Sequence, residues 1–209
     1  MTSTAGSIGA GNVAFLALNT VNTSATVNGV LPIVGAGQTM NSSLTIGSIS
    51  TVARGSLDPG TSQTKEVGTT GYNFASVKLT TGSAEDMTLR SIRWNQTGSS
   101  GSGDLANVKT VVNGTSYPAT VSTDGKYYTT VFPGGLPVQK GFSIDATIQG
   151  DIVSGSARTV DFDIAKRTDI NIEGNLFKYG ITPPYGSGTT NDASDFRTTE
   201  DPYYDASEV

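Results

Sequence analysis

The sequence predicts an all-β protein, a two-layer antiparallel β-sandwich with an additional N-terminal β segment. Glycine is abundant, with 26 residues among 209, and only 15% of the residues are charged, a composition typical of strands joined by tight turns. Val, Ile, Leu, Phe and Tyr recur in short blocks that alternate with polar residues, which is the period of a strand. Gly, Thr, Ser and Val are too dense for a helix of useful length.

The N-terminal segment, residues 1–54, contains three strand signals. They cover 13–18, 25–34 and 43–52, and each is bounded by Gly, Asn or Pro. Three interpretations are open: the tail of a preceding repeat, a small extra sheet, or a partial sandwich that a neighbouring subunit completes by strand addition.

The turn Leu57-Asp58-Pro59-Gly60 marks the predicted module boundary, because it combines a turn initiator, a fixed φ and a permissive φ. The sandwich is predicted over residues 55–185. Its expected strands are 72–79, 87–94, 107–112, 116–121, 126–132, 142–148, 159–164 and 169–172. Asn113-Gly114 and Asp124-Gly125 predict tight hairpin turns, since these dipeptides accept positive φ.

Two of these strands have informative side-chain patterns. In 159–164, apolar residues alternate with Asp161 and Asp163, which places the two carboxylates on the solvent face. In 87–94 the alternation breaks, because Met87 and Leu89 are out of phase with Ile92 and Trp94. A β-bulge near Arg90–Ser91 would turn all four side chains inward.

The segment 186–209 is predicted to be an acidic, flexible tail. From residue 191 onward it holds six acids and one arginine, which equals the chain's whole net charge of -5, whereas the remaining chain has 12 acids and 12 bases. A neutral body without a basic cluster argues against nucleic acid and against anionic membrane surfaces as partners. No apolar run approaches the roughly 20 residues of a membrane span.

The chain has no histidine and no cysteine. Catalytic arrangements that use either residue are excluded, as are nitrogen or sulfur ligand sets for zinc, copper, haem or iron–sulfur clusters. We therefore expect a non-enzymatic, secreted structural or binding module. An enzyme that uses carboxylates alone would need two acids facing each other in a pocket.

Several runs resemble the immunoglobulin-like repeats of large bacterial cell-surface and S-layer-like proteins. They are 83–89 (SAEDMTL), 91–98 (SIRWNQTG), 104–108 (DLANV), 150–160 (GDIVSGSARTV) and 179–183 (YGITP). The resemblance covers about residues 54–184. It implies an immunoglobulin-like sandwich at the cell surface, structural or adhesive in a surface layer or filament, whose strands and sheet edges join other copies or neighbouring modules. It implies no catalytic residues.

Calcium is the only cofactor with candidate ligands. Asp169-Ile170-Asn171-Ile172-Glu173-Gly174 begins like an EF-hand loop, but its twelfth position is Gly180 rather than Glu, so a strand with a polar outer face is favoured. Asp161 and Asp163 are further candidate calcium ligands, and solvated strand faces are again the favoured interpretation.

Glycan binding is the alternative function, because flat aromatic rings can stack on sugars. Tyr127 and Tyr128 are the candidate residues, although neighbours on a strand point to opposite faces, so only one can face outward. Trp94, the only tryptophan, is predicted to pack in the core.

Overall fold

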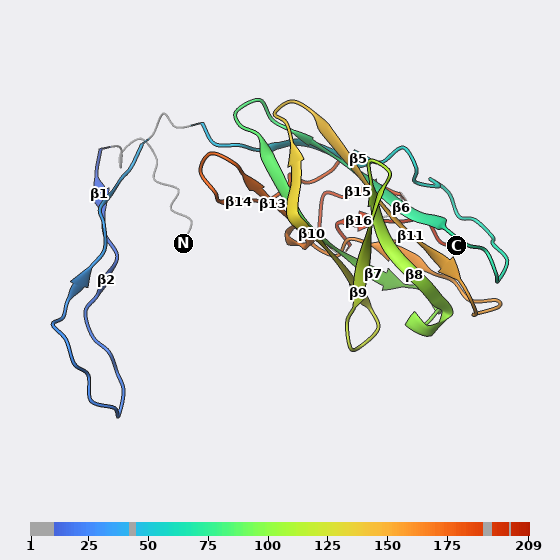
Figure 1. Cartoon of the computed structure of the whole chain (residues 1–209). Coiled ribbons are helices and arrows are strands. Elements are labelled where there is room, and N and C mark those ends of the chain that lie inside the picture. Colours follow the sequence, from blue (N-terminus) through green and yellow to red (C-terminus); the bar gives the residue numbers. More distant parts are fainter. Residues whose placement is uncertain (1–10, 42–44, 190–193, 201) are drawn as a thin grey trace. The chain divides into compact units, whose positions relative to one another are not determined.

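The computed structural model describes residues 11–41, 45–189, 194–200 and 202–209, and it confirms the all-β prediction (Figure 1). The chain divides into two compact units, Met1–Thr45 and Ile46–Val209. The boundary therefore lies before the predicted one at residue 54, because the strand at 49–54 pairs with the larger unit. No helix in the described ranges is long and apolar enough to cross a membrane.

The first unit contains a two-stranded antiparallel ribbon, which we define as residues 11–41. Its strands are β1 (Val13–Ala14), β2 (Ala17–Leu18), β3 (Ile33–Val34) and β4 (Gln38–Thr39). Strand β1 pairs with β4, and β2 pairs with β3. No residue of the ribbon is buried.

The second unit contains the core and the remaining strands. These strands are β5 (Ile49–Arg54), β6 (Tyr72–Thr81), β7 (Met87–Thr97), β8 (Leu105–Val112), β9 (Thr115–Val121), β10 (Tyr127–Val138), β11 (Ser143–Ile152), β12 (Asp161–Asp163), β13 (Ile170–Gly174), β14 (Gly180–Ile181), β15 (Asp195–Phe196) and β16 (Tyr204–Asp205). Two short 3-10 turns, Ser102–Asp104 and Arg167–Asp169, precede β8 and β13.

Strands β5 to β14 form one antiparallel sheet that folds over into two layers, as predicted for a sandwich, and β15 and β16 form a separate two-stranded sheet. One layer has the order β5-β6-β11-β8-β9, and the other has the order β9-β10-β7-β13-β14, with β12 beside β7. Strand β9 belongs to both layers, since it pairs with β8 through Thr115–Pro118 and with β10 through Ala119–Val121. The core lies between the layers, where Phe74 of β6 meets Phe162 of β12 at 5.1 Å between ring centroids.

The predicted bulge in β7 is confirmed. Ile172 of β13 lies opposite Leu89, and the preceding residue, Asn171, lies opposite Ser91, so Arg90 is the additional residue. Met87, Leu89, Ile92 and Trp94 are all buried. The bulge therefore resolves the break in alternation that the sequence shows.

Both predicted hairpins are present. Asn113 and Gly114 have φ of 49° and 78°, which is the positive-φ pair that a tight turn between β8 and β9 requires. In the second hairpin only Gly125 has positive φ, at 73°. Asp124 instead accepts hydrogen bonds from the Lys126 amide and the Ser122 hydroxyl.

The flexible-tail prediction for 186–209 is wrong for the described residues. Phe196, Tyr203, Tyr204 and Ala206 are buried, because the aromatic side chains of this segment complete the core. Strand β15 pairs with β16, and the Val160 and Val209 backbones exchange two hydrogen bonds. Part of the segment, 190–193 and 201, lies outside the described residues.

Candidate functional site

Asp169, Asn171 and Glu173, the EF-hand-like calcium candidates, do not form a calcium loop. Asp169 accepts hydrogen bonds from Arg93 Nε at 2.9 Å and from the Lys166 amide at 3.0 Å. Asn171 and Glu173 lie on β13, where Glu173 pairs with Arg90 at 2.5 Å. The hydrogen bond from Arg90 lowers the pKa of Glu173. Arginines thus hold both carboxylates, and the Ile170–Gly174 run is a strand, which is the interpretation that the sequence favoured.

Asp161 and Asp163 lie on β12, close to two acids of the C-terminal segment, Asp205 and Glu208. The local sequence around β12 did not reveal this. Asp163 is 4% exposed and accepts 2.9 Å hydrogen bonds from the Thr97 hydroxyl and the Ala206 amide. Asp161 Oδ1 is buried and has no hydrogen-bond partner among the described residues. The prediction that both carboxylates face solvent is wrong, because the C-terminal segment covers β12.

Burial of these two side chains changes their acidity. Burial first, then the charges of Asp163, Glu208 and Asp205, raise the pKa of Asp161 to about 7. Burial also raises the pKa of Asp163 to about 6, against the opposing hydrogen bonds from Ala206 and Thr97. No group of three or more acidic side chains within the described ranges is arranged to hold a metal ion.

The two glycan candidates lie on β10 and point to opposite faces, as expected. Tyr128 is 4% exposed and packs edge-on against Phe162, with 5.1 Å between centroids, so its ring belongs to the core. Tyr127 is half-buried, and the Arg93 guanidinium lies 4.9 Å from its ring centroid. Tyr128 is therefore corrected from a glycan candidate to a core residue. Trp94 is fully buried, as predicted.

A cavity of about 860 Å³ opens at the end of the sandwich where β6 begins and β7 and β11 end. Its walls come from loops 62–67, 100–105 and 152–160 and from residues 208–209. Its lining combines apolar side chains with several hydroxyl groups and contains no aromatic ring. A stacking surface for sugars is thus missing from this lining.

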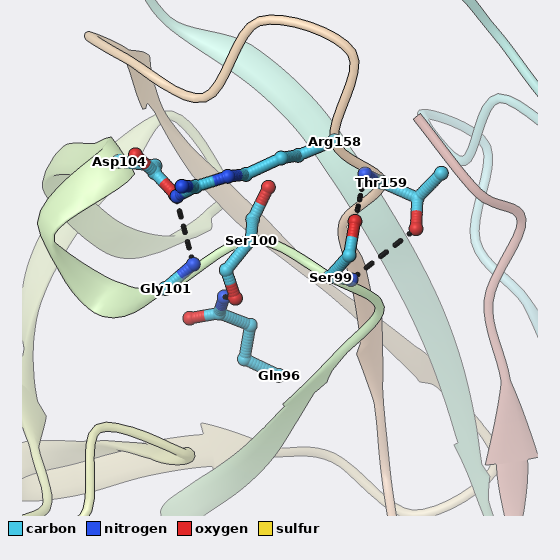
Figure 2. A network of polar contacts seen from close by, with 7 residues as sticks. All are labelled: Gln96, Ser99, Ser100, Gly101, Asp104, Arg158 and Thr159. Carbon is cyan, nitrogen blue, oxygen red and sulfur yellow. Dashed lines mark hydrogen bonds and ion pairs between the residues drawn. The ribbon is translucent and has the colours of Figure 1, made fainter.

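Figure 2 shows the polar network that frames this cavity. Asp104 Oδ2 accepts a 2.9 Å hydrogen bond from the Gly101 amide and a 2.7 Å bond from Arg158. The Gly101 bond first, and Arg158 second, lower the pKa of Asp104. Ser99 and Thr159 exchange two further bonds, at 2.9 and 3.3 Å. These contacts are made within the protein, so the network holds the loops together.

The ribbon has an unusual surface, because it carries no charge and no core. All 13 basic and 18 acidic side chains of the chain lie at Arg54 or beyond it. Nine large apolar side chains of the ribbon are exposed; they are Val13, Phe15, Leu16, Leu18, Val21, Val27, Val30, Ile33 and Val34. The sequence-based predictions missed this division of the chain into an uncharged N-terminal segment and a charged remainder. A count of charges along the chain would have found it.

Both faces of the ribbon are apolar. Leu18 lies opposite Ile33, and strand alternation places Leu16 on the same face. The other face carries Val13 and Phe15, whose side chains lie over Gly37: a Cβ at that glycine would meet them at 2.7 and 2.8 Å. Strands that are apolar on both faces are typical of sheets covered on both sides.

Comparison of the chain with protein families, with curated proteins and with solved structures finds no match. Among the described residues, the ribbon with its exposed apolar side chains is the feature that most needs a partner.

Proposed function

We propose that this protein is a structural module of an extracellular assembly, a bacterial surface layer or filament, in which copies associate through the ribbon. The observation that carries the proposal is the ribbon's surface, uncharged and apolar on both faces. An isolated two-stranded ribbon is at best marginally stable in water, and contiguous exposed apolar surface marks interaction sites. Association of copies would cover the exposed apolar side chains of the ribbon.

The second unit suits the role of the repeated body. Its core contains every buried hydrophobic side chain of the described residues, from Ile49 to Ala206. Its two layers are joined through antiparallel strand pairs and through the Trp94–Thr110 hydrogen bond of 3.0 Å. Such a body would bear load while the ribbon provides the joint. The bacterial and extracellular setting of the proposal comes from the resemblance to cell-surface repeats.

The test compares the assembly state of the full chain with that of a Leu16→Lys/Ile33→Lys variant, by light scattering and negative-stain microscopy. We expect ordered oligomers from the unmodified chain. Burial of each large apolar side chain contributes about 1.5–3 kcal/mol, so loss of two should weaken association at least about 100-fold.

Val131→Lys is the matched control, because Val131 is 63% exposed on β10 and Ile33 is 60% exposed on the ribbon. The control variant should assemble like the unmodified chain. A chain that stays monomeric at every concentration, or a control that dissociates as readily as the ribbon variant, would contradict the proposal.

A further inference from the structure

Strand β5 is the terminal strand of its layer; β15 lies close to it but forms no ladder with it. The register partners of β5 all lie in β6, from Ile49 opposite Thr81 to Arg54 opposite Val77. No backbone hydrogen bond among the described residues reaches the outer side of β5. The backbone N–H and C=O groups of such an edge are a template for another strand.

This edge lacks the residues that usually protect an edge from pairing. Residues 46–53 contain no charged side chain and no proline, and the first charge is Arg54 at the strand's end. A bulge interrupts the register at Ser50, whose hydroxyl bonds back to the Thr80 carbonyl at 3.1 Å. The four residues Thr51–Arg54 beyond it keep regular register, and Thr51 and Ala53 are exposed.

The edge of the other layer is different. Strand β14 has only two residues, Gly180 and Ile181, and Lys178 precedes it while Pro183 and Pro184 follow it. Short length, a nearby lysine and proline are the devices that keep an edge from pairing. The β14 edge therefore combines several of these devices, whereas β5 has only the bulge at Ser50 and keeps four residues of regular strand beyond it.

The ribbon and the β5 edge share one composition. The uncharged stretch runs without interruption from residue 1 to Ala53, so it includes both the ribbon and the edge strand up to its last residue. A partner that binds through charge, such as nucleic acid or an anionic membrane, would find no countercharge there. The ribbon of a second copy is itself uncharged and apolar, so it matches the uncharged β5 edge.

We infer that the β5 edge of one copy receives the ribbon of a second copy as an added strand. The inference rests on the proposed function and names its acceptor surface. Because ribbon and edge are different surfaces, the contact is heterologous, and repetition extends it into an open chain unless the geometry closes into a ring. Backbone hydrogen bonds to Thr51–Arg54 would provide affinity, and the ribbon's apolar side chains would provide specificity.

Cysteine cross-linking tests the inference cleanly, because the chain has no cysteine of its own. The full chain is prepared as Ala17→Cys, in the ribbon, and as Ala53→Cys, on β5; both positions are exposed. One variant carries a mass tag, the two are mixed under oxidising conditions, and cross-linked species are counted. Thr120→Cys, at an exposed position of β9, replaces Ala53→Cys in the control mixture.

We expect the Ala17→Cys and Ala53→Cys mixture to give at least fivefold more heterodimer than the control mixture. Equal yields, or a predominance of Ala17-to-Ala17 homodimers, would overturn the inference. A Thr51→Lys variant gives a second readout: assembly should weaken at least tenfold with an unchanged urea midpoint, whereas Thr120→Lys should assemble normally. Undiminished assembly of Thr51→Lys would count against the β5 edge.

The two proposals fail in different ways. If the unmodified chain never associates, the proposed function is wrong and no cross-link should form. If the chain associates but cross-links avoid Ala53, the ribbon joins copies through another surface, and only the assignment of the β5 edge is wrong.

Discussion

The hydroxyl of Tyr204 donates a 2.5 Å hydrogen bond to Asp58 Oδ2, across 146 positions of the sequence. The same carboxylate accepts the Ser76 amide at 2.9 Å and, through Oδ1, the Gly60 amide at 2.8 Å. One side chain therefore joins the turn before β6, strand β6 itself and the C-terminal segment. Burial first, and the charge of Asp58 second, raise the pKa of Tyr204.

Replacement of Tyr204 by Phe should destabilise the second unit by about 1–3 kcal/mol, because it removes a buried hydrogen bond to a charged group. Urea unfolding followed by circular dichroism measures the change. Tyr127→Phe is the control, since Tyr127 is only half-buried and its ring faces Arg93. Equal stability of the two variants would show that the C-terminal segment contributes nothing at this contact.

Local chemistry explains which parts of the fold the sequence could predict. The turn at Asp58-Pro59-Gly60, the Asn113-Gly114 hairpin and the bulge at Arg90 each depend on a few consecutive residues, and each is present. The prediction that this turn is the module boundary is wrong, because the two units divide between Thr45 and Ile46. The turn's partner, Tyr204, is far away in the sequence, and no local pattern pairs them.

The same limit explains the errors at the C-terminus and at β12. The acids of 186–209 suggested a solvated tail, whereas Phe196, Tyr203 and Tyr204 drive the described part of that segment into the core. Its docking then buries Asp163 and the Oδ1 atom of Asp161, whereas strand alternation alone predicts that both carboxylates face water. The ribbon was recognised as a β segment, but its solvent exposure follows from the absence of a covering layer and only the structure shows it.

The carboxylates of Asp161 and Asp163 should make the protein less stable as pH rises from 5 to 8. Their pKa values are raised to about 7 and about 6 in the folded state, above the usual 3.8, so the folded state binds more protons than the unfolded one. The stabilisation is complete below about pH 4 and is lost as pH passes the folded values. We expect a loss of about 1–2 kcal/mol over this window, measured by urea unfolding.

Asp161→Asn isolates this effect, because an amide keeps the shape without a titrating charge. The variant should be about 1 kcal/mol more stable than the unmodified chain at pH 8 and should differ little at pH 5. Glu66→Gln, which changes an exposed carboxylate on the 62–67 loop, should leave the pH profile unaltered. A pH profile of Asp161→Asn identical to that of the unmodified chain would contradict the assignment.

Thr110 should be the most sensitive polar residue between the two layers. Its hydroxyl accepts the Trp94 indole N–H at 3.0 Å and lies 2.8 Å from the Thr130 hydroxyl, all in buried surroundings. Thr110→Val leaves two buried groups unpaired and should cost about 1–3 kcal/mol, whereas Thr130→Val keeps the indole bond and should cost less. Because the chain has one tryptophan, its fluorescence during urea unfolding reports this site directly. The reverse order of the two variants would argue against the indole bond as the main contribution.

Calcium should leave the stability of the second unit unchanged. Asp169 is bound by Arg93 and Glu173 by Arg90, so a cation would have to displace an arginine at each before it gained a carboxylate ligand. Calcium prefers six to eight oxygen ligands, and these pairs offer it few. Thermal unfolding with millimolar calcium and with a chelator should give the same midpoint.

The Arg93→Ala variant is the informative comparison, because it removes the arginine that binds Asp169. If calcium raises the unfolding midpoint of that variant alone, the arginine excludes the ion, and the geometry of the strand does not. An increase in the unmodified chain would show that its carboxylates bind calcium despite their arginine partners.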